Sequence, residues 1–293
     1  PYVTYENDYI ESEWWALKQI YDKGLLYKGF QIVPYCPRCG TPLATHEVAQ
    51  GYKTVKERSA VVRFKAKGED AYFLAWTTTP WTLPSNVALT VNPDEVYCKV
   101  KAADGYTYYM AKALPDTVLG RLAKDGAPAY EILESMTGKE LEYREYEPLF
   151  ACTGEFVAKT GKKAHFLTCA NYVTMTDGTG IVHTAPAFGA NDLKTGRRYD
   201  LPFVQFVDGK GDMTENTPYA GKFDKEADPL ILHDLKEEGL LFDAPNFEHE
   251  YPFCWRCDTP LIYYARDSWF IEMTKVRENL IQNNNTINWI PES

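Results

Sequence analysis

The spacing of apolar residues changes along the chain, from a helical period at the start to strand-like runs in the middle. Four apolar side chains recur at spacings of four, three and four residues: Ile10, Trp14, Leu17 and Tyr21. This period predicts an amphipathic helix, with Asn7 or Asp8 able to cap its start and Gly24 able to end it. We interpret this helix as a packing element, because none of its residues suggests chemistry.

Short apolar runs bounded by turn residues dominate the chain from residue 52 onward. The predicted strands are residues 60–64, 71–75, 87–90, 96–100, 106–109, 165–168, 172–174 and 181–183. A helix is expected to begin at Asp228-Pro229 and to end at Gly239. Residues 268–271 are predicted to be extended, and Thr274 is expected to cap a last helix. The pattern predicts a β-rich α+β fold.

Composition narrows the classes of protein that this chain can represent. Its 293 residues suffice for one large domain or two smaller ones with a real core. A net charge of −10 argues against a broad basic surface for duplex nucleic acid. No apolar run reaches membrane-spanning length and no secretory signal opens the chain, so we expect a cytoplasmic protein without a membrane partner. Pro1 is not a natural first residue, which predicts a fragment of a longer protein.

Two Cys-x-x-Cys pairs stand far apart in the sequence. The first comprises Cys36 and Cys39, the second Cys254 and Cys257, with 214 residues between the pairs. Four thiolates suit tetrahedral zinc and leave no open coordination position, so we expect a structural zinc ion that fastens the two ends of a long insertion. The alternative is four buried thiols without a metal. A redox role has less support, because neither pair follows a strand and opens a helix as in thioredoxin.

The stretch 76–84, WTTTPWTLP, places a cluster of hydroxyl groups at the end of an apolar strand. Its two prolines are expected to exclude regular structure and to favour extended backbone before each of them. The threonines are then held on backbone that cannot easily slip, where uncharged hydroxyls can line a small polar pocket. Such a pocket can hold a water molecule or an ester carbonyl. An ordinary strand is the alternative, because threonine favours strands.

Residues 178–192, GTGIVHTAPAFGAND, form the second informative stretch. Its glycines permit a tight turn, and after Gly189 the chain is expected to enter a helix with Asp192 in the first turn. Asp192 can serve that helix end electrostatically, or point into a cavity and bind an ammonium group. Taken alone, Asp192 favours the helix-end role and His183 favours a hydrogen-bonded core histidine.

Together these pieces resemble isoleucyl-tRNA synthetases, specifically their inserted editing domain and the edges of the surrounding catalytic domain. The resemblance covers nearly the whole chain: the lead-in with paired tryptophans (9–29), the zinc knuckle (36–39), the threonine-rich motif (76–84), the second editing motif (178–192) and the exit segment (267–291). Valyl and leucyl relatives usually carry a TTRP-type motif, so Pro80-Trp81 fits the isoleucyl type better. Ala190-Asn191 departs from the family, in which an acidic residue is common before the aspartate.

The resemblance implies that the chain hydrolyses valine wrongly attached to isoleucine tRNA, by attack of a positioned water on the ester. Isoleucyl-tRNA synthetases are themselves the standard example of a synthetic site that discriminates one methylene too weakly and needs a second, smaller site. Neither a HIGH-like nor a KMSKS-like signature is present, so ATP-dependent charging is not expected of this chain. Two rival functions remain: a zinc-clipped docking module without chemistry, and editing of the valyl type, which removes threonine.

The family match also implies roles for individual residues. Asp192 is expected to bind the α-ammonium group, and His183 to form a wall that excludes the extra methyl of isoleucine, with a general base as the second choice. The hydroxyls expected to hold the terminal adenosine, the ester and the attacking water belong to Thr77, Thr78 and Thr79. The further residues expected at the substrate are Trp76, Trp81, Thr82, Thr179 and Gly180. Core packing is the alternative for at least one of the tryptophans.

The expected partners are the 3′ end of isoleucine tRNA and the remainder of a synthetase. Whether valyl-adenylate is destroyed in the same pocket stays open. Basic residues that can meet the RNA are Lys162, Lys163, Lys194, Arg197 and Arg198, although most such charges are ordinary solvated surface. The resemblance implies three parts: the lead-in helix and first zinc half-site (1–50), a barrel-like editing domain (51–245), and the second half-site with the exit segment (246–293).

Overall fold

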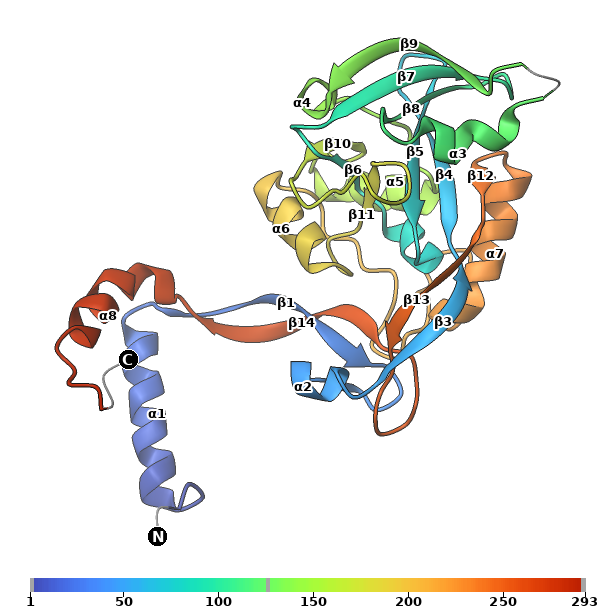
Figure 1. The fold of residues 1–293 in the computed structure, drawn as a ribbon. Coiled ribbons are helices and arrows are strands. Elements are labelled where there is room, and N and C mark those ends of the chain that lie inside the picture. Colours follow the sequence, from blue (N-terminus) through green and yellow to red (C-terminus); the bar gives the residue numbers. More distant parts are fainter. Residues whose placement is uncertain (1–2, 125–126, 291–293) are drawn as a thin grey trace. The chain divides into compact units, whose positions relative to one another are not determined.

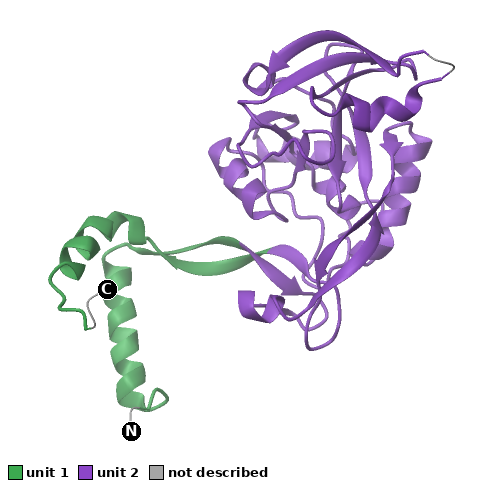
Figure 2. Cartoon of the chain, in the orientation of Figure 1, with its two compact units in different colours: residues 1–31, 265–293 green, residues 32–264 purple. Residues whose placement is uncertain are grey.

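The computed structural model of the protein describes residues 3–124 and 127–290. The chain divides into two compact units (Figure 2), one comprising residues 1–31 and 265–293 and the other residues 32–264. Strands β1 (Leu26–Cys36) and β14 (Ile262–Ile271) are hydrogen-bonded neighbours and contribute residues to both units. No helix among the described residues is long and apolar enough to cross a membrane.

The smaller unit is built mainly from helices. It contains α1 (Asn7–Asp22), η3 (Met273–Val276) and α8 (Arg277–Asn284). The predicted first helix is confirmed, and Gly24 follows it with a φ of 67°. The predicted caps were wrong: Glu6 is the N-cap of α1 without a side-chain bond, and Thr274 lies inside η3. No residue of α1 is buried, so its apolar stripe does not pack as expected within the described chain.

A branched, mixed sheet forms the centre of the larger unit (Figure 1). In spatial order its main path within the described residues is β10 (Phe166–Cys169), β6 (Ala88–Val91), β11 (Val182–Thr184), β5 (Tyr72–Thr77), β8 (Thr107–Ala111), β7 (Val96–Ala102) and β9 (Tyr130–Thr137). Strand β4 (Ala60–Lys65) pairs with β5, and β12 (Leu241–Asp243) pairs with β4. The result is a β-rich α+β fold with a curled, half-barrel sheet, and seven of the eight predicted strands are confirmed.

The eighth predicted strand was wrong, because Tyr172 lies in a turn and residues 173–174 have no regular secondary structure. The Tyr172 hydroxyl points toward Asp192, and the Val173 carbonyl accepts a hydrogen bond from the Asn92 side chain at 3.0 Å. These contacts with side chains take the place of a ladder with a neighbouring strand.

The larger unit also contains helices and helical turns. They are α2 (Thr45–Val48), η1 (Pro80–Ser85), α3 (Pro115–Leu119), η2 (Gly120–Leu122), α4 (Gly138–Leu141), α5 (Ala151–Thr160), α6 (Ala190–Arg198) and α7 (Asp224–Glu237). The predicted start of α7 at Asp228-Pro229 was wrong by one turn, because the Asp224 N–H bonds to Gly211 and the chain is already helical there. Pro229 therefore lies inside the helix.

The helical turn η1 also corrects a prediction. Residues 80–85 form a 3₁₀-helix although two prolines lie within it. Pro80 occupies the first turn, where the backbone N–H that proline lacks has no partner within the helix anyway. The prolines therefore shorten and constrain this segment without excluding helical structure.

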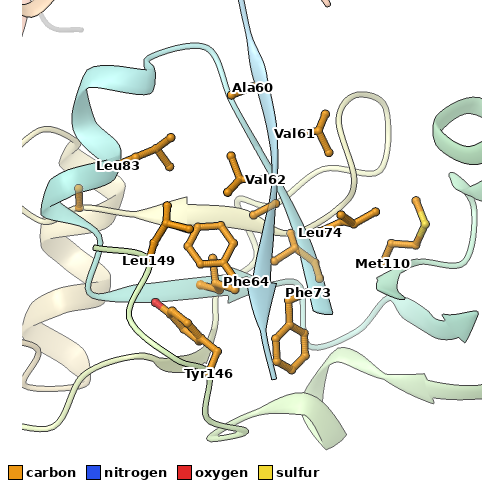
Figure 3. Packing of buried hydrophobic residues seen from close by; sticks show 14 of the residues in the cluster. Ala60, Val61, Val62, Phe64, Phe73, Leu74, Leu83, Met110, Tyr146 and Leu149 are labelled. Carbon is orange, nitrogen blue, oxygen red and sulfur yellow. The ribbon is translucent and has the colours of Figure 1, made fainter. Parts of the chain in front are cut away.

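The sheet buries the main core (Figure 3). Phe64, Phe73 and Leu74 of β4 and β5 are almost fully buried, together with Tyr146. Burial of each such side chain stabilises the fold by about 1.5–3 kcal/mol relative to its exposure. This packing gives β5 a rigid position, so the segment that leaves its end starts from a fixed point.

An antiparallel ribbon joins the sheet to the two cysteine pairs. Strand β3 (Tyr52–Arg58) pairs with β13 (Asn246–Pro252), so that Arg58 lies opposite Asn246 and Tyr52 opposite Pro252. The first cysteine pair lies in the hairpin between β1 and β2 (Thr41–Pro42), and the second follows β13. Pairing of β3 with β13 thus brings together residues about two hundred positions apart.

Candidate active site

Two parallel strands place both sequence motifs at the same edge of the sheet. Strand β5 runs parallel to β11, with Trp76 opposite Val182. The threonine segment leaves the carboxyl end of β5, and residues 185–192 leave the carboxyl end of β11. Crevices outside the carboxyl ends of parallel strands are common ligand sites, because the outgoing segments diverge there.

A cavity of about 250 Å³ lies between these two segments. The residues that line it are Trp76, Thr77, Thr78, Thr79, Thr82, Val182, His183, Ala185, Phe188 and Asp192. The hydroxyl groups of one motif therefore share a hollow with the carboxylate of the other. A polar cluster and a carboxylate that line one hollow can bind a small ligand that carries both an ester or hydroxyl group and an ammonium group.

Three of the predicted substrate residues do not line this cavity. Trp81 is buried, and its ring packs edge-on against Phe188 with centroids 5.0 Å apart. Thr179 and Gly180 lie in the turn before β11, where a Cβ on Gly180 would come within 2.3 Å of the Ala111 side chain. Their positions are those of packing residues that support the pocket from outside.

The threonine hydroxyls form a row along the pocket. Thr79 Oγ1 lies 3.3 Å from both Thr77 Oγ1 and Thr82 Oγ1. The Thr79 N–H donates to Thr77 Oγ1 at 3.1 Å, and the Thr82 hydroxyl donates to the Thr79 carbonyl at 2.8 Å. Thr78 also lines the cavity, and its side chain makes no hydrogen bond within the described chain. Thr78 therefore offers a hydroxyl that a ligand can use without breaking an internal bond.

His183 has a defined tautomer. The Asn86 side-chain amide donates to the Ala88 carbonyl at 2.9 Å, which fixes the amide nitrogen on the side where it also meets His183 Nδ1 at 3.2 Å. Nδ1 therefore accepts, so the ring proton is on Nε2, which donates to Thr82 Oγ1 at 2.7 Å. The Tyr146 hydroxyl donates to the other end of the amide at 2.6 Å. Burial lowers the pKa of His183 to about 4, so the ring is neutral at physiological pH.

Asp192 is held at the opposite wall by two donors. Its carboxylate accepts the Ala185 N–H at 2.9 Å and lies 3.4 Å from the Tyr172 hydroxyl. Gly189 allows this position, because a Cβ there would lie 2.9 Å from the Asp192 carboxyl carbon. Burial raises the pKa of Asp192 to about 6, although both donors oppose the rise. The pocket therefore holds a carboxylate that has no cationic partner among the residues that the structure describes.

Sequence reasoning missed several residues of this site. Asn86 and Tyr146 orient His183 from behind, and Phe188 contributes to the pocket wall. Phe188 lies within the second motif, so the sequence could have predicted that it lies close to the cavity. No sequence pattern points to Asn86 or Tyr146, because their side chains bond to each other although they are 60 positions apart in the sequence.

The four predicted metal-binding cysteines come together in one cluster. All four sulfur atoms lie within 4.8 Å of one another, and Cys257 Sγ is 3.4 Å from Cys36 Sγ and 3.5 Å from Cys39 Sγ. Sulfur atoms around tetrahedral zinc are about 3.8 Å apart, given a Zn–S distance of about 2.3 Å. The donor set and its spacing fit a structural zinc ion.

The two cysteine turns have matching backbones. The Gly40 N–H donates to the Cys36 carbonyl at 2.9 Å, and the Asp258 N–H donates to the Cys254 carbonyl at 2.8 Å. Both donor residues have a positive φ, 68° at Gly40 and 60° at Asp258. This pairing of turns directs two thiols from each side to a common centre. Bound zinc would close the site with four sulfur ligands and would fasten the start of β3 to the end of β13, at the end of the ribbon where Tyr52 lies opposite Pro252.

Comparison with known proteins identifies the family. All of residues 1–293 match the family described as tRNA synthetases class I (I, L, M and V). The chain belongs to the class I tRNA synthetase family. It is 54% identical to the isoleucine–tRNA ligase of Clostridium novyi (strain NT), over 100% of this chain and 27% of that protein. It is 46% identical to the isoleucine–tRNA ligase of Picrophilus torridus, over 99% of this chain and 27% of that protein.

Solved structures in the same family share the fold. The cytosolic leucyl-tRNA synthetase editing domain of P. falciparum matches with a TM-score of 0.51 and 13% identity, over 64% of this chain and 99% of that chain. The corresponding P. knowlesi domain matches with a TM-score of 0.50 and 15% identity, over 67% and 98%. This synthetase chain therefore has an editing-domain fold, and it spans 27% of the length of the isoleucine–tRNA ligases that it matches.

Proposed function

We propose that this class I synthetase chain hydrolyses valine from wrongly charged isoleucine tRNA. The observation that carries the proposal is the shared cavity, in which Thr78 faces a space closed on another side by Asp192. A docking module has no need of a small pocket with an anionic anchor. At about 250 Å³ the cavity is smaller than the roughly 300–1,000 Å³ typical of pockets for drug-sized ligands, so it suits the aminoacyl group alone.

Asp192 is the proposed anchor for the α-ammonium group of the amino acid. The carboxylate keeps its two neutral donors and gains a charge-assisted hydrogen bond from the substrate, worth about 1.5–3 kcal/mol. This bond would fix the amino acid at one end of the cavity. The ester carbonyl is then directed toward the threonine row at the other side.

His183 is the proposed wall of the pocket. Its Nδ1 accepts from Asn86 and its Nε2 proton is donated to Thr82, so the neutral ring has no lone pair available for a water proton. This arrangement supports a steric role and argues against a general base. A side chain held from both ends also resists the displacement that an additional methyl group would require.

The proposed reaction uses a water molecule and no covalent intermediate. The water oxygen bonds to the ester carbonyl carbon, the ester C–O bond breaks, and a ribose hydroxyl of the tRNA leaves with a proton. The products are free valine and uncharged tRNA. Threonine hydroxyls and backbone N–H groups would orient the water and stabilise the developing oxyanion, and orientation supplies much of the acceleration.

The proposed zinc ion would play no part in this chemistry. When bound, it supplies a closed structural link between Cys36, Cys39, Cys254 and Cys257. The proposed partners are the 3′ end of isoleucine tRNA and the remaining three quarters of a synthetase. Lys162 is already paired with Asp200 at 2.6 Å, which makes it a weaker candidate for RNA contact.

The test is deacylation by the 293-residue chain. Isoleucine tRNA charged with radiolabelled valine is compared with the same tRNA charged with isoleucine, and threonine esters of valine tRNA form a third arm. We expect release of valine and much slower release of isoleucine. No valine release at enzyme concentrations that saturate the tRNA would support the docking module, and preferential release of threonine would support valyl-type editing.

A further inference from the structure

The first backbone N–H of η1 is bonded by a carboxylate from a distant helix. Asp228 of α7 accepts the Trp81 N–H at 2.7 Å, across 147 positions of sequence. Pro80, the first residue of η1, has no N–H to offer. Asp228 therefore satisfies a donor that an N-cap side chain normally satisfies from within the same segment.

Thr79 occupies the N-cap position of η1, but its side chain bonds to other residues. Thr79 is the N-cap, but its side chain makes no capping bond. Its Oγ1 instead lies between Thr77 Oγ1 and Thr82 Oγ1 in the row that borders the cavity. Threonine is a good capping residue, so a carboxylate from α7 in the capping role leaves the Thr79 hydroxyl available for the row that borders the cavity.

Asp228 occupies this position at an electrostatic cost. Burial raises its pKa to about 7, against the opposing effects of Lys225 and the Trp81 N–H, and the charges of Asp224 and Glu57 add to the rise. Lys225 is itself paired with Glu57 at 2.8 Å. Carboxylates retained in such surroundings are concentrated at functional sites.

We propose that Asp228 is a positioning residue for the threonine segment. Its bond to Trp81 anchors η1 one residue before Thr82, whose hydroxyl oxygen accepts the hydrogen bond from His183 Nε2. Asp228 does not line the cavity, so it acts through η1 and not on the substrate. The effect of Asp228 on catalysis rests on the proposed hydrolysis. Its role in holding η1 in place does not depend on that function.

Three variants distinguish a specific role of Asp228 in holding η1 from a general effect on the stability of the fold. Asp228→Ala removes the acceptor, and Asp228→Asn keeps an acceptor oxygen without the charge. Asp234→Ala is the control, because Asp234 lies on the same helix and accepts the Tyr219 hydroxyl at 2.9 Å, and makes no hydrogen bond to η1 among the described residues. Far-ultraviolet circular dichroism and urea unfolding identify the variants that remain folded.

The first readout is hydrogen exchange of the Trp81 amide, which needs no activity. We expect exchange to be at least about tenfold faster in Asp228→Ala, because the Trp81 N–H loses its acceptor there, and to change little in Asp228→Asn or Asp234→Ala. An unchanged Trp81 exchange rate in folded Asp228→Ala overturns the anchor. Equal acceleration in Asp234→Ala also overturns it, because the effect would then be global.

The second readout is valine release under single-turnover and saturating conditions. Asp228→Ala should lower kcat about 10- to 100-fold, the cost of a misplaced catalytic group, with a smaller change in KM and recovery in Asp228→Asn. Unchanged kcat alongside faster exchange would refute the positioning role. If the unaltered chain releases no valine, the proposed function fails, and hydrogen exchange alone decides whether Asp228 anchors η1.

Discussion

His183 Nε2 lies 2.7 Å from Thr82 Oγ1, although the two residues are 101 positions apart in sequence. This bond joins the two motifs directly. Because Asn86 supplies the other hydrogen bond of the ring, His183 is held in one orientation at the pocket wall. This side of the cavity is therefore formed by a hydrogen-bonded ring and not by loose apolar packing, so the proposed contribution of His183 to selectivity is testable.

Replacement of His183 should relax selectivity before it abolishes hydrolysis. His183→Ala enlarges the cavity, so isoleucine esters should be hydrolysed nearly as fast as valine esters. A single methylene is worth about 10- to 200-fold in discrimination, and we expect most of that factor to be lost. The measurement is the ratio of deacylation rates for isoleucine tRNA charged with each amino acid.

The control for this variant is His165→Ala, because His165 is buried but does not line the cavity. His165→Ala should leave the ratio unchanged. Retention of full discrimination in His183→Ala would remove His183 from the wall.

Loss of the charge on Asp192 should weaken valine release about 10- to 100-fold, as expected for a charge-assisted hydrogen bond of about 1.5–3 kcal/mol. Asp192→Asn keeps an acceptor for the Ala185 N–H, so the fold should persist. Asp116→Asn, at a surface aspartate that accepts the Tyr130 hydroxyl, is the matched control. The quantity to compare is kcat/KM for valine release, and an unaltered value for Asp192→Asn would exclude Asp192 as the anchor.

The pH dependence of the same reaction should follow Asp192. Burial raises the pKa of Asp192 to about 6, and the ionised form is the one that binds an ammonium group, so kcat/KM should rise with pH through about 6 and level off above it. The pKa of His183 is lowered to about 4, so protonation of this ring should add no step near neutral pH. A profile between pH 5 and 7 that is flat, or that falls as pH rises, would contradict this assignment.

Metal analysis should find about one zinc ion per chain, because four thiolates saturate one tetrahedral site. Cys257→Ser should lose zinc and lower the thermal unfolding temperature. Cys152→Ser is the control, since Cys152 lies outside the four-cysteine cluster. A folded, metal-free sample of unchanged stability would refute the zinc clip.

Gly178 should tolerate no side chain. It has a φ of 69°, and a Cβ would lie 2.7 Å from the Trp76 ring that borders the cavity. Gly178→Ala should lower the free energy of unfolding by about 2–4 kcal/mol, combining backbone strain with overpacking. Gly68→Ala isolates the strain, because Gly68 also has a positive φ but open space around it, and it should cost only about 1–2 kcal/mol. Urea unfolding measures the free energy of unfolding of both variants. Equal decreases would mean that the Trp76 ring shifts to make room for the new Cβ at no measurable energetic cost.

The sequence by itself determined the local elements and the chemical groups. Helical period predicted α1, apolar runs predicted strands such as β5 and β11, and two cysteine pairs predicted a four-sulfur cluster. These inferences succeeded because they depend on the nature of residues close together in the chain. Two predictions based on single prolines were wrong: Pro80 was expected to exclude regular structure but lies in η1, and Pro229 was expected to start a helix but lies inside α7. In both places the surrounding contacts determine the backbone more than the proline does.

Only the tertiary structure decided how these groups meet. The parallel register of Trp76 with Val182 places the threonines beside Asp192, and Asn86 fixes the His183 proton. Both arrangements depend on pairings between segments roughly a hundred residues apart, which no local pattern encodes. The cavity exists because packing of the whole sheet selects one register among many that the sequence pattern alone would permit.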